Sequence, residues 1–556
     1  MVGNTTDITR RTVMKSAGAF AGGVALVGVV SGDEDAAAEP GEPVPEFEFA
    51  SYTVEEDPIR YETAVFATEM WQELGFEVEH NPTEIGALLD MTFDEKEHEV
   101  MGVRMGGQPQ RMDPDHFLYN GFHSQFHDQP GSYNISWYQS EEYDEVVEEQ
   151  RRTADPDERQ ELVYECQEIL ARDVAEIFLF EQYEVQPLNT ERFTNWDDSM
   201  PGAGLWDIWN IHSIEPADDD VTTFRYGYPG GDVLTLNPWE PFPTQDVLQM
   251  NLIYDKLVQI TPEGEYEPWA LSEVERVDGE TIDVELRDGM TWHDGEDVTV
   301  DDLIFTMEYG MEHDGGPAYG DIEAVEEGGD LDVRIHLVDE IAPFEIMGLG
   351  TIWLAPQHVW EDVDDPFEVE EIDRTASGLY EFDFWSPDEE MRLQRFDDHW
   401  NPANVEELVW IPSSGISPLF RALIGGELDM IAWTLTLDQI PEAEEQPFLE
   451  TFEIGDMAHH VIALNHRYPP FDDLAVRRAL ATATPEHDIM DVTLGGTLDE
   501  GGYADRIHTP ITPSVEFWHN PDIPEEYQYD FDLEEARAIL EEEGYTWEDG
   551  RIHYPE

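Results

Sequence analysis

The chain has 556 residues, 128 acidic and 27 basic, and its formal net charge is -101 at pH 7. Its length and its 40% hydrophobic content allow two or three domains with a large core, while the missing basic patch excludes a nucleic-acid partner. The acidic residues are spread through apolar, patterned segments, which argues against a disordered acidic tail. With three lysines (Lys15, Lys96 and Lys256), this composition indicates a halophilic protein, because about 1 M salt shortens the Debye length to roughly 3 Å and screens the repulsion.

The first 38 residues have the pattern of a targeting signal. Arg10 and Arg11 precede an apolar run from Ala17 to Val30, which resembles a twin-arginine export signal. The run is too short and its side chains are too small for a comfortable membrane span. We therefore expect an extracellular, cell-surface associated protein, exported by the twin-arginine route, with residues 39–46 as an acidic, proline-rich linker.

The first half of the remaining chain alternates between strand and helix patterns. The only cysteine, Cys166, lies on the apolar face of the clearest helix, so we interpret it as a core residue that forms no disulfide within the chain. Asp155 is suited to cap that helix and Pro156 to occupy its first position. The predicted elements in this half are a strand at 47–52, a helix ending at Gly75, strands at 76–80 and 98–105, the helix at 155–173, and a buried strand at 175–185.

The second half begins after a linker-like stretch at 213–221. Alternating Ile282, Val284 and Leu286 predict a strand with a turn at each end, and Thr299 with Asp302 predicts a capping box at the start of a helix. Further helices are expected near 417–425, 473–483 and 531–543, and a strand is expected to start at Trp547. No repeat is present, and the fold class is α/β with mixed sheets.

Several segments of this half resemble one known family. They are "LNPW" (236–239), "LRDGMTWHDGEDVTVDDLIFTM" (286–307), "ASGLYEF" (376–382), "ALIGGELDM" (422–430), "ALNHRYPPFDDLAVRRALATA" (463–483) and "FDLEEARAILEEEGY" (531–545). In order and spacing they are similar to extracellular solute-binding protein family 5, the oligopeptide- and dipeptide-binding proteins of ABC importers, here of a haloarchaeal type. The resemblance implies a two-lobed periplasmic-binding-protein-like fold of type II with three subdomains. It also implies a monomer that captures a peptide-like or other small polar solute and delivers it to the importer's permease subunits, without enzymatic activity or a cofactor.

The order of the segments differs from that of the family and resembles a circular permutation. In the family the segment like 531–545 lies mid-chain, and the parts that follow it resemble residues 47–173 here. A truncated fusion of two proteins is the alternative. Under permutation the expected parts are 47–195, second half of the C-terminal lobe; 196–250, hinge and first part of the N-terminal lobe; 251–372, additional subdomain of that lobe; 373–455, its remainder; and 456–556, first half of the C-terminal lobe.

The resemblance also implies ligand-binding residues in the segment before Pro114. Arg104 stands where family members hold a peptide carboxylate, a role that suits the fork of a guanidinium. Gln110 stands where an aspartate of the family binds the peptide ammonium, and the neighbouring Arg111 further disfavours a cation, so a neutral or anionic solute is expected. Asp113 belongs to the same segment. The alternative for Arg104 is a strand arginine paired with one of the many carboxylates.

Aromatic residues are the other candidates. Trp239, Tyr254 and Trp433 are ligand-lining residues by family position, although each is also a plausible core residue. Stacked aromatics with polar amides also suit a sugar, which leaves an oligosaccharide-binding protein of the same importer class as an alternative. His123 and His127 are four residues apart and make a secreted metal-dependent hydrolase the remote alternative. We expect no catalytic residue and no metal site.

The charge predicts a strong salt dependence. Lowering the salt from about 3 M to 0.1 M lengthens the Debye length to about 10 Å, so crowded carboxylates repel one another and stability falls. The melting temperature, followed by circular dichroism across this range, is expected to drop steeply. Sucrose at matched osmolality serves as the control and should not replace the salt; a melting temperature that stays flat would contradict the interpretation.

Overall fold

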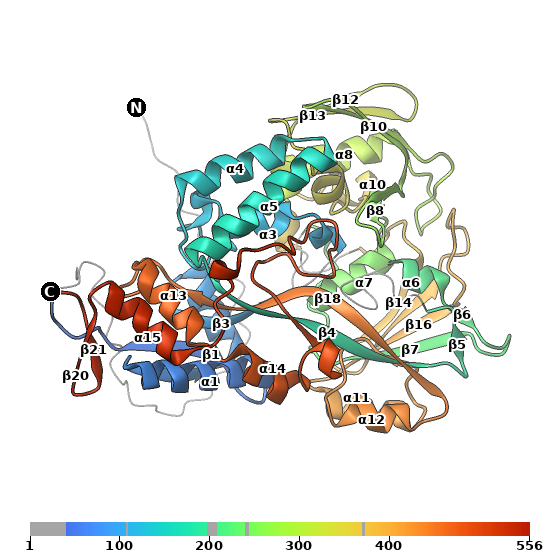
Figure 1. Ribbon diagram of the computed structural model, residues 1–556. Helices are drawn as coiled ribbons and strands as arrows, with labels where there is room; N and C mark the ends of the chain where they lie inside the picture. Colours follow the sequence, from blue (N-terminus) through green and yellow to red (C-terminus); the bar gives the residue numbers. More distant parts are fainter. Residues whose placement is uncertain (1–39, 107–108, 197–207, 240–243, 370–372) are drawn as a thin grey trace. The chain divides into compact units, whose positions relative to one another are not determined.

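The computed structural model describes residues 40–106, 109–196, 208–239, 244–369 and 373–556 (Figure 1). The predicted twin-arginine signal and cleavage region lies outside these residues. Among the residues described, no helix has both the length and the apolar character needed to cross a membrane.

A large mixed sheet organises the described chain. Its strands run in the order β14-β15-β16-β7-β17-β4-β18-β3-β1-β2, and β19 pairs with β4. β1 pairs in parallel with β2 and β3, and β7 in parallel with β16, while most other neighbours are antiparallel. This mixture confirms the predicted α/β class. The strands are β1 (Phe47–Tyr52), β2 (Val78–Thr83), β3 (Val100–Met105), β4 (Ile177–Asn189), β7 (Thr223–Tyr228), β14 (Tyr380–Ser386), β15 (Glu390–Arg395), β16 (Glu407–Pro412), β17 (Met430–Ile431), β18 (Leu449–Leu464) and β19 (Ala504–Arg506).

Two long antiparallel strands, β4 and β18, hold the middle of this sheet. Their pairing runs from Leu449 opposite Asn189 to Ile462 opposite Ile177. The register shifts between Gly455 and His459, which marks a bulge. Because β18 also pairs with β3 and β4 with β17, these two strands connect the two halves of the sheet.

The main helices begin and end where the sequence predicts. In α1 (Pro58–Leu74), Asp57 accepts a hydrogen bond from the Arg60 amide and Gly75 ends the helix with φ of 109°. In α5 (Pro156–Asp173), the Asp155 side chain accepts from the first free amides. The predicted capping box of Thr299 and Asp302 opens α8 (Val300–Glu312). Local capping chemistry thus fixes these boundaries.

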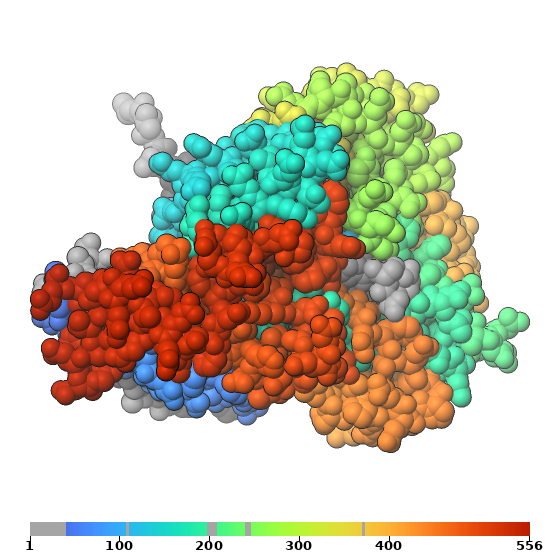
Figure 2. Space-filling model, in the orientation of Figure 1, coloured from blue at the N-terminus to red at the C-terminus, as the bar shows by residue number. Residues whose placement is uncertain are grey.

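One core beside the sheet is built from residues that are far apart in the chain. The Phe47 ring lies 4.9 Å from the Phe471 ring, centroid to centroid. The Trp71 indole donates a hydrogen bond of 3.1 Å to the Leu480 carbonyl, and Tyr554 belongs to the same cluster. Figure 2 shows blue N-terminal and red C-terminal parts of the described chain adjoining on one face. Residues near Phe47 and near Tyr554 are therefore neighbours.

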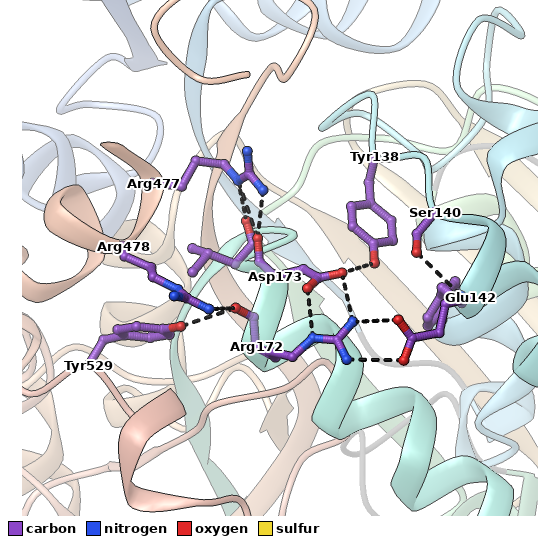
Figure 3. Close-up of polar contacts among 10 residues, drawn as sticks. Tyr138, Ser140, Glu142, Arg172, Asp173, Arg477, Arg478 and Tyr529 are labelled. Carbon is purple, nitrogen blue, oxygen red and sulfur yellow. Dashed lines mark hydrogen bonds and ion pairs between the residues drawn. The ribbon is translucent and has the colours of Figure 1, made fainter. Parts of the chain in front are cut away.

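The C-terminal end of α5 is held by side chains from α13 (Leu474–Thr482) and the loop before α15 (Figure 3). Arg477 donates to the Asp173 carbonyl at 2.8 Å and Arg478 to the Arg172 carbonyl at 3.0 Å. The Tyr529 hydroxyl donates to the Arg172 carbonyl as well, at 3.3 Å. Cations near the last carbonyls of a helix complement its dipole, so these contacts stabilise the packing of two distant segments.

A second, four-stranded antiparallel sheet lies within residues 271–337. Its order is β10-β11-β13-β12, and α8 contacts β12 and β13. The predicted hairpin around Ile282 and Val284 is confirmed as β10 and β11, with both side chains buried. The strands are β10 (Leu271–Asp278), β11 (Thr281–Leu286), β12 (Ile322–Glu327) and β13 (Asp332–Leu337).

The strand predicted to start at Trp547 is a short hairpin in the structure. β20 (Thr546–Glu548) and β21 (Arg551–His553) pair with each other. The turn at Asp549–Gly550 reverses the chain after three residues, as this dipeptide favours. The hairpin packs on the end of α1, where the Trp547 indole donates to the Leu74 carbonyl at 2.7 Å.

Shorter elements complete the described fold. The stretch 213–221, predicted to be a linker, contains β6, which pairs with β5. The remaining strands and helices are β5 (Phe193–Thr194), β6 (Glu215–Pro216), β8 (Val258–Ile260), β9 (Tyr266–Pro268), α2 (Ile85–Leu89), α3 (Asp115–Phe122), α4 (Glu141–Arg152), α6 (Ile208–Ser213), α7 (Thr244–Ile253), α9 (Pro317–Gly320), α10 (Gln357–Trp360), α11 (Ile416–Ile424), α12 (Gln439–Glu444), α14 (Glu486–Leu494) and α15 (Leu533–Glu542).

Replacing Gly75 by alanine tests the packing of the hairpin on α1. A Cβ there would lie 2.6 Å from the Trp547 indole nitrogen and 2.9 Å from the Gly550 carbonyl oxygen, at a positive φ. We expect Gly75→Ala to reduce the free energy of unfolding by about 2 to 4 kcal/mol, as the sum of backbone strain and steric overlap. Gly289→Ala is the matched control, since its φ of 78° is also positive but nothing lies within 4 Å of the added Cβ. Equal losses in chemical denaturation would show that the hairpin does not pack there.

Candidate solute-binding site

The predicted carboxylate anchor, Arg104, already contacts two carboxylates. It lies on β3 opposite His460 of β18, and its Nη2 is 3.5 Å from Glu184 Oε1 and in an ion pair with Asp456. Both acids are buried. Burial lowers the pKa of Arg104 and raises that of Glu184. The geometry is that of the alternative considered above, a strand arginine paired with carboxylates, and ligand binding by Arg104 stays a prediction.

Trp433 lies beside this ion pair. Its ring centroid is 5.4 Å from the guanidinium carbon of Arg104, a cation–π distance. Tyr228 contacts the indole edge-to-face, with ring centroids 5.7 Å apart. The structure therefore brings together two of the predicted site residues, Arg104 and Trp433.

Asp113 and Tyr254 serve the packing of the protein. Asp113 receives two hydrogen bonds of 2.7 Å from Arg159 of α5, and both side chains are buried. This bidentate pair fixes the turn before α3 against α5. Tyr254 is fully buried in the core that covers β7 and β14. The side chain of Gln110 lies outside the described residues, so its predicted role remains a prediction.

A cavity of about 720 Å³ is the best candidate for a ligand site, and it is the one meant by "the cavity" below. It is lined by residues within 111–133, 238–256, 314–319 and 347–353. Of the predicted residues, Arg111 and Trp239 line it, whereas Arg104, Asp113, Tyr254 and Trp433 do not. Its volume falls within the range of about 300–1,000 Å³ that is usual for small-molecule sites.

The cavity carries more positive than negative groups. Arg111 and Lys256 line it together with His116, and the one acid among its described lining residues, Asp314, is exposed; its other polar groups, such as Asn120, are neutral. Burial and the nearby Arg111 hold the pKa of His116 well below its ordinary value, so its imidazole is neutral near pH 7. Sequence reasoning missed Lys256 as a site residue. The available signal was a lysine, one of three in the chain, within the apolar stretch "LIYDKLVQI".

The two histidines considered as metal ligands are not on a common helix. α3 ends at Phe122, His123 Nε2 lies 3.2 Å from Glu148, and His127 contacts the Ser124 carbonyl. Within the described chain, one group of histidine and acidic side chains is close enough to share a cation: His487, Asp491 and Glu500. All three are exposed.

The chain belongs to the family described as bacterial extracellular solute-binding proteins, family 5 middle. The sequence profile of this family matches residues 265–554, more than half of the chain. With the mixed α/β architecture described above, the membership defines a periplasmic-binding-protein-like fold. It bears out the resemblance drawn from the hairpin and helix motifs between residues 286 and 545.

Individual relatives are distant. The chain is 24% identical over 343 residues to the oligopeptide-binding protein AppA of Bacillus subtilis, covering 58% of this chain and 60% of that protein. It is 22% identical over 334 residues to the glutathione-binding protein GsiB of Shigella boydii, covering 57% and 60%. It thus spans about three fifths of the length of these curated relatives.

The similarity to solved structures is also distant. AppA of Bacillus subtilis in complex with a nonapeptide has a TM-score of 0.47 at 19% identity, with 59% of this chain and 65% of that chain covered. A periplasmic oligopeptide-binding protein of Thermotoga maritima has a TM-score of 0.49 at 19% identity, with 61% and 66% covered.

Removing Arg104 should destabilise the protein. Arg104→Met leaves Glu184 and Asp456 buried without a cation, and breaking a buried pair in this way costs about 3 to 5 kcal/mol. Arg334→Met is the control, because the Arg334–Asp283 pair is about 40% exposed and exposed ion pairs contribute little to stability. Chemical denaturation in molar salt measures both variants. Adding Glu184→Gln to Arg104→Met should recover part of the loss, and a silent Arg104→Met would contradict the structural role.

Proposed function

We propose that this chain is the extracellular solute-binding protein of an ABC importer. It captures a peptide-like or other small polar solute and delivers it to the permease subunits in the membrane, acting as a monomer by recognition without turnover. The cavity of about 720 Å³ is the observation that carries the proposal, because a solute-binding protein needs a concave site of about this size. The names of the relatives AppA and GsiB, which bind oligopeptides and glutathione, support a peptide-like solute.

An oligosaccharide is the second candidate solute. The aromatic side chains of Trp239, Tyr319 and Trp353 line the cavity, and flat aromatic surfaces suit sugar rings. The sparse supply of carboxylates in the cavity, with Asp314 at its rim, disfavours a solute with a free ammonium group in either case. This agrees with the expectation drawn from Gln110 and Arg111.

We also propose that the segment order is a circular permutation of the family's order. Residues 47–195 and 456–556 would then complete one lobe, and 196–455 would form the hinge and the other lobe with its additional subdomain. The shared core of Phe47, Trp71 and Phe471 and the parallel pairing of β1 with β3, itself paired with β18, support this order. Export by the twin-arginine route and a haloarchaeal origin are proposed on the signal motif and the charge.

Ligand-induced stabilisation tests the function. We expect a mixture of short peptides, and not malto-oligosaccharides, to raise the melting temperature in molar salt and to be recovered unchanged by mass spectrometry. A ligand at 100 times its Kd adds about 2.7 kcal/mol to the free energy of unfolding.

Two tryptophan substitutions locate the binding. Asn120→Trp adds an indole to the cavity wall and should abolish the shift, while Glu145→Trp, on the exposed surface of α4, should preserve it. A shift with sugars alone would favour the oligosaccharide reading. Cleaved peptides would favour a hydrolase, and the absence of any shift would contradict a solute-binding role.

A further inference from the structure

Lys256 presents a buried ammonium group to the cavity without a partner of opposite charge. The residue is 6% exposed and lies just before β8. Its Nζ is 5.6 Å from the centre of the Trp353 ring, and within the described residues it makes no hydrogen bond or ion pair. The backbone of Lys256 forms a β-bridge with Trp353, and its carbonyl accepts a hydrogen bond from the Ala270 amide. The fold therefore requires the main chain of Lys256 but not its charge. Burial lowers the pKa of Lys256 to about 8.

Arg111 lines the same cavity and also has no carboxylate partner within the described chain. Its Nε is buried without a hydrogen bond, and its guanidinium carbon is 5.9 Å from the Phe117 ring centre. Burial lowers the pKa of Arg111, and a side-chain hydrogen bond with Tyr133, which is not a carboxylate, acts in the opposite direction.

Other buried cations of the chain are held by oxygen atoms. Arg159 is paired with Asp113, Arg276 with Glu345, and Lys96 donates to the Asn134 carbonyl and the Ser132 hydroxyl. The chain has 128 acidic residues available for such pairs. The lack of an ion-pair partner for Lys256 and Arg111 is therefore a property of this cavity and does not reflect a shortage of carboxylates in the chain.

The free-energy cost of burying these positive charges indicates which kind of ligand the cavity binds. A buried cation without a counter-charge costs several kcal/mol, and the cost is offset when an anion with hydrogen-bond acceptors is bound beside it. Trp239, Tyr319 and Trp353 line the same cavity and are here called the aromatic wall. A metal ion or an ammonium ligand would be repelled.

We propose that Lys256, in a cavity that also carries the positive charge of Arg111, binds an oxyanion group of the solute, a carboxylate or a phosphate, while the aromatic wall holds its uncharged body. This rests on the proposed function and assigns the chemical class of its solute. Trp239 and Arg111 were predicted as ligand-lining residues, whereas Lys256 supplies the second charge that makes the site selective.

Paired probes test the proposal. N-acetylated tetrapeptide mixtures with a free carboxylate are compared with the same mixtures ending in an amide, and with inorganic phosphate, by calorimetry in molar potassium chloride. We expect the free acids to bind at least about tenfold more tightly than the amides, the effect of one charge-assisted hydrogen bond. Binding of phosphate alone at that strength, with weak binding of the acids, would identify the oxyanion as a phosphate.

Two variants assign the effect to the side chains. Lys256→Met and Arg111→Met should each remove the preference for the acids, while the melting temperature of the empty protein stays equal or rises because an unpaired charge is lost. Arg334→Met removes the same charge from the exposed surface and should keep the preference. Equal binding of acids and amides by all proteins would overturn the oxyanion site and leave the proposed function standing; no binding of any probe would overturn both.

Proton uptake gives an independent readout. The other titratable groups that line the cavity with Lys256 are Arg111, His116, Tyr133, Asp314 and Tyr319. An anion beside Lys256 raises its pKa above about 8, so binding at pH 8.5 must take up protons. Calorimetry in two buffers of different ionisation enthalpy measures this uptake. It should disappear in Lys256→Met and persist in Arg334→Met, and an acid probe that binds wild type without uptake would contradict the proposal.

Discussion

The pairing of β4 with β18 is the constraint on which the rest of the structure depends. It connects the strands around β7 with those around β1, and its bulge near Met457 is stabilised by Glu181, whose carboxylate accepts from the Met457 amide at 3.0 Å. The same bulge turns Asp456 toward Arg104 of β3. Because Arg104 and its carboxylates are buried, strand register and charge pairing are fixed together.

The charge of the cavity differs in sign from that of the chain as a whole. The sequence as a whole carries a net charge of -101, which suits screening by concentrated salt, yet the cavity contains Arg111 and Lys256 with a single acid at its rim. In molar salt, long-range attraction of a solute is screened within a few ångströms, so recognition must come from direct contact in a desolvated space. A buried lysine and arginine against an aromatic wall satisfy that requirement.

The sequence was sufficient where structure is local. Gly75, Asp155 and the Thr299–Asp302 box end or begin helices through contacts within a few residues, and the motifs of the second half identified the family. The pairing of Arg104 with Asp456 was out of reach because it depends on the register of strands about 350 residues apart. The hairpin at Trp547 was predicted as a single strand, although Asp549–Gly550 is a hairpin signal. Lys256 was visible as a rare residue, but only the tertiary structure shows that it has no counter-ion.

Identifying the solute that the protein retains on purification is the most direct test of the proposal that the cavity binds an anionic solute. Mass spectrometry of the small molecules released by denaturing protein purified in molar salt, after exposure to a peptide-rich extract, gives this identity without a prior choice of ligand. We predict an intact solute with a carboxylate or phosphate group and no free amine. The amount bound should be lower in the Lys256→Met variant and unchanged in the Arg334→Met variant. A cationic solute, a metal ion, hydrolysis products, or no solute at all from such an extract would contradict the proposal.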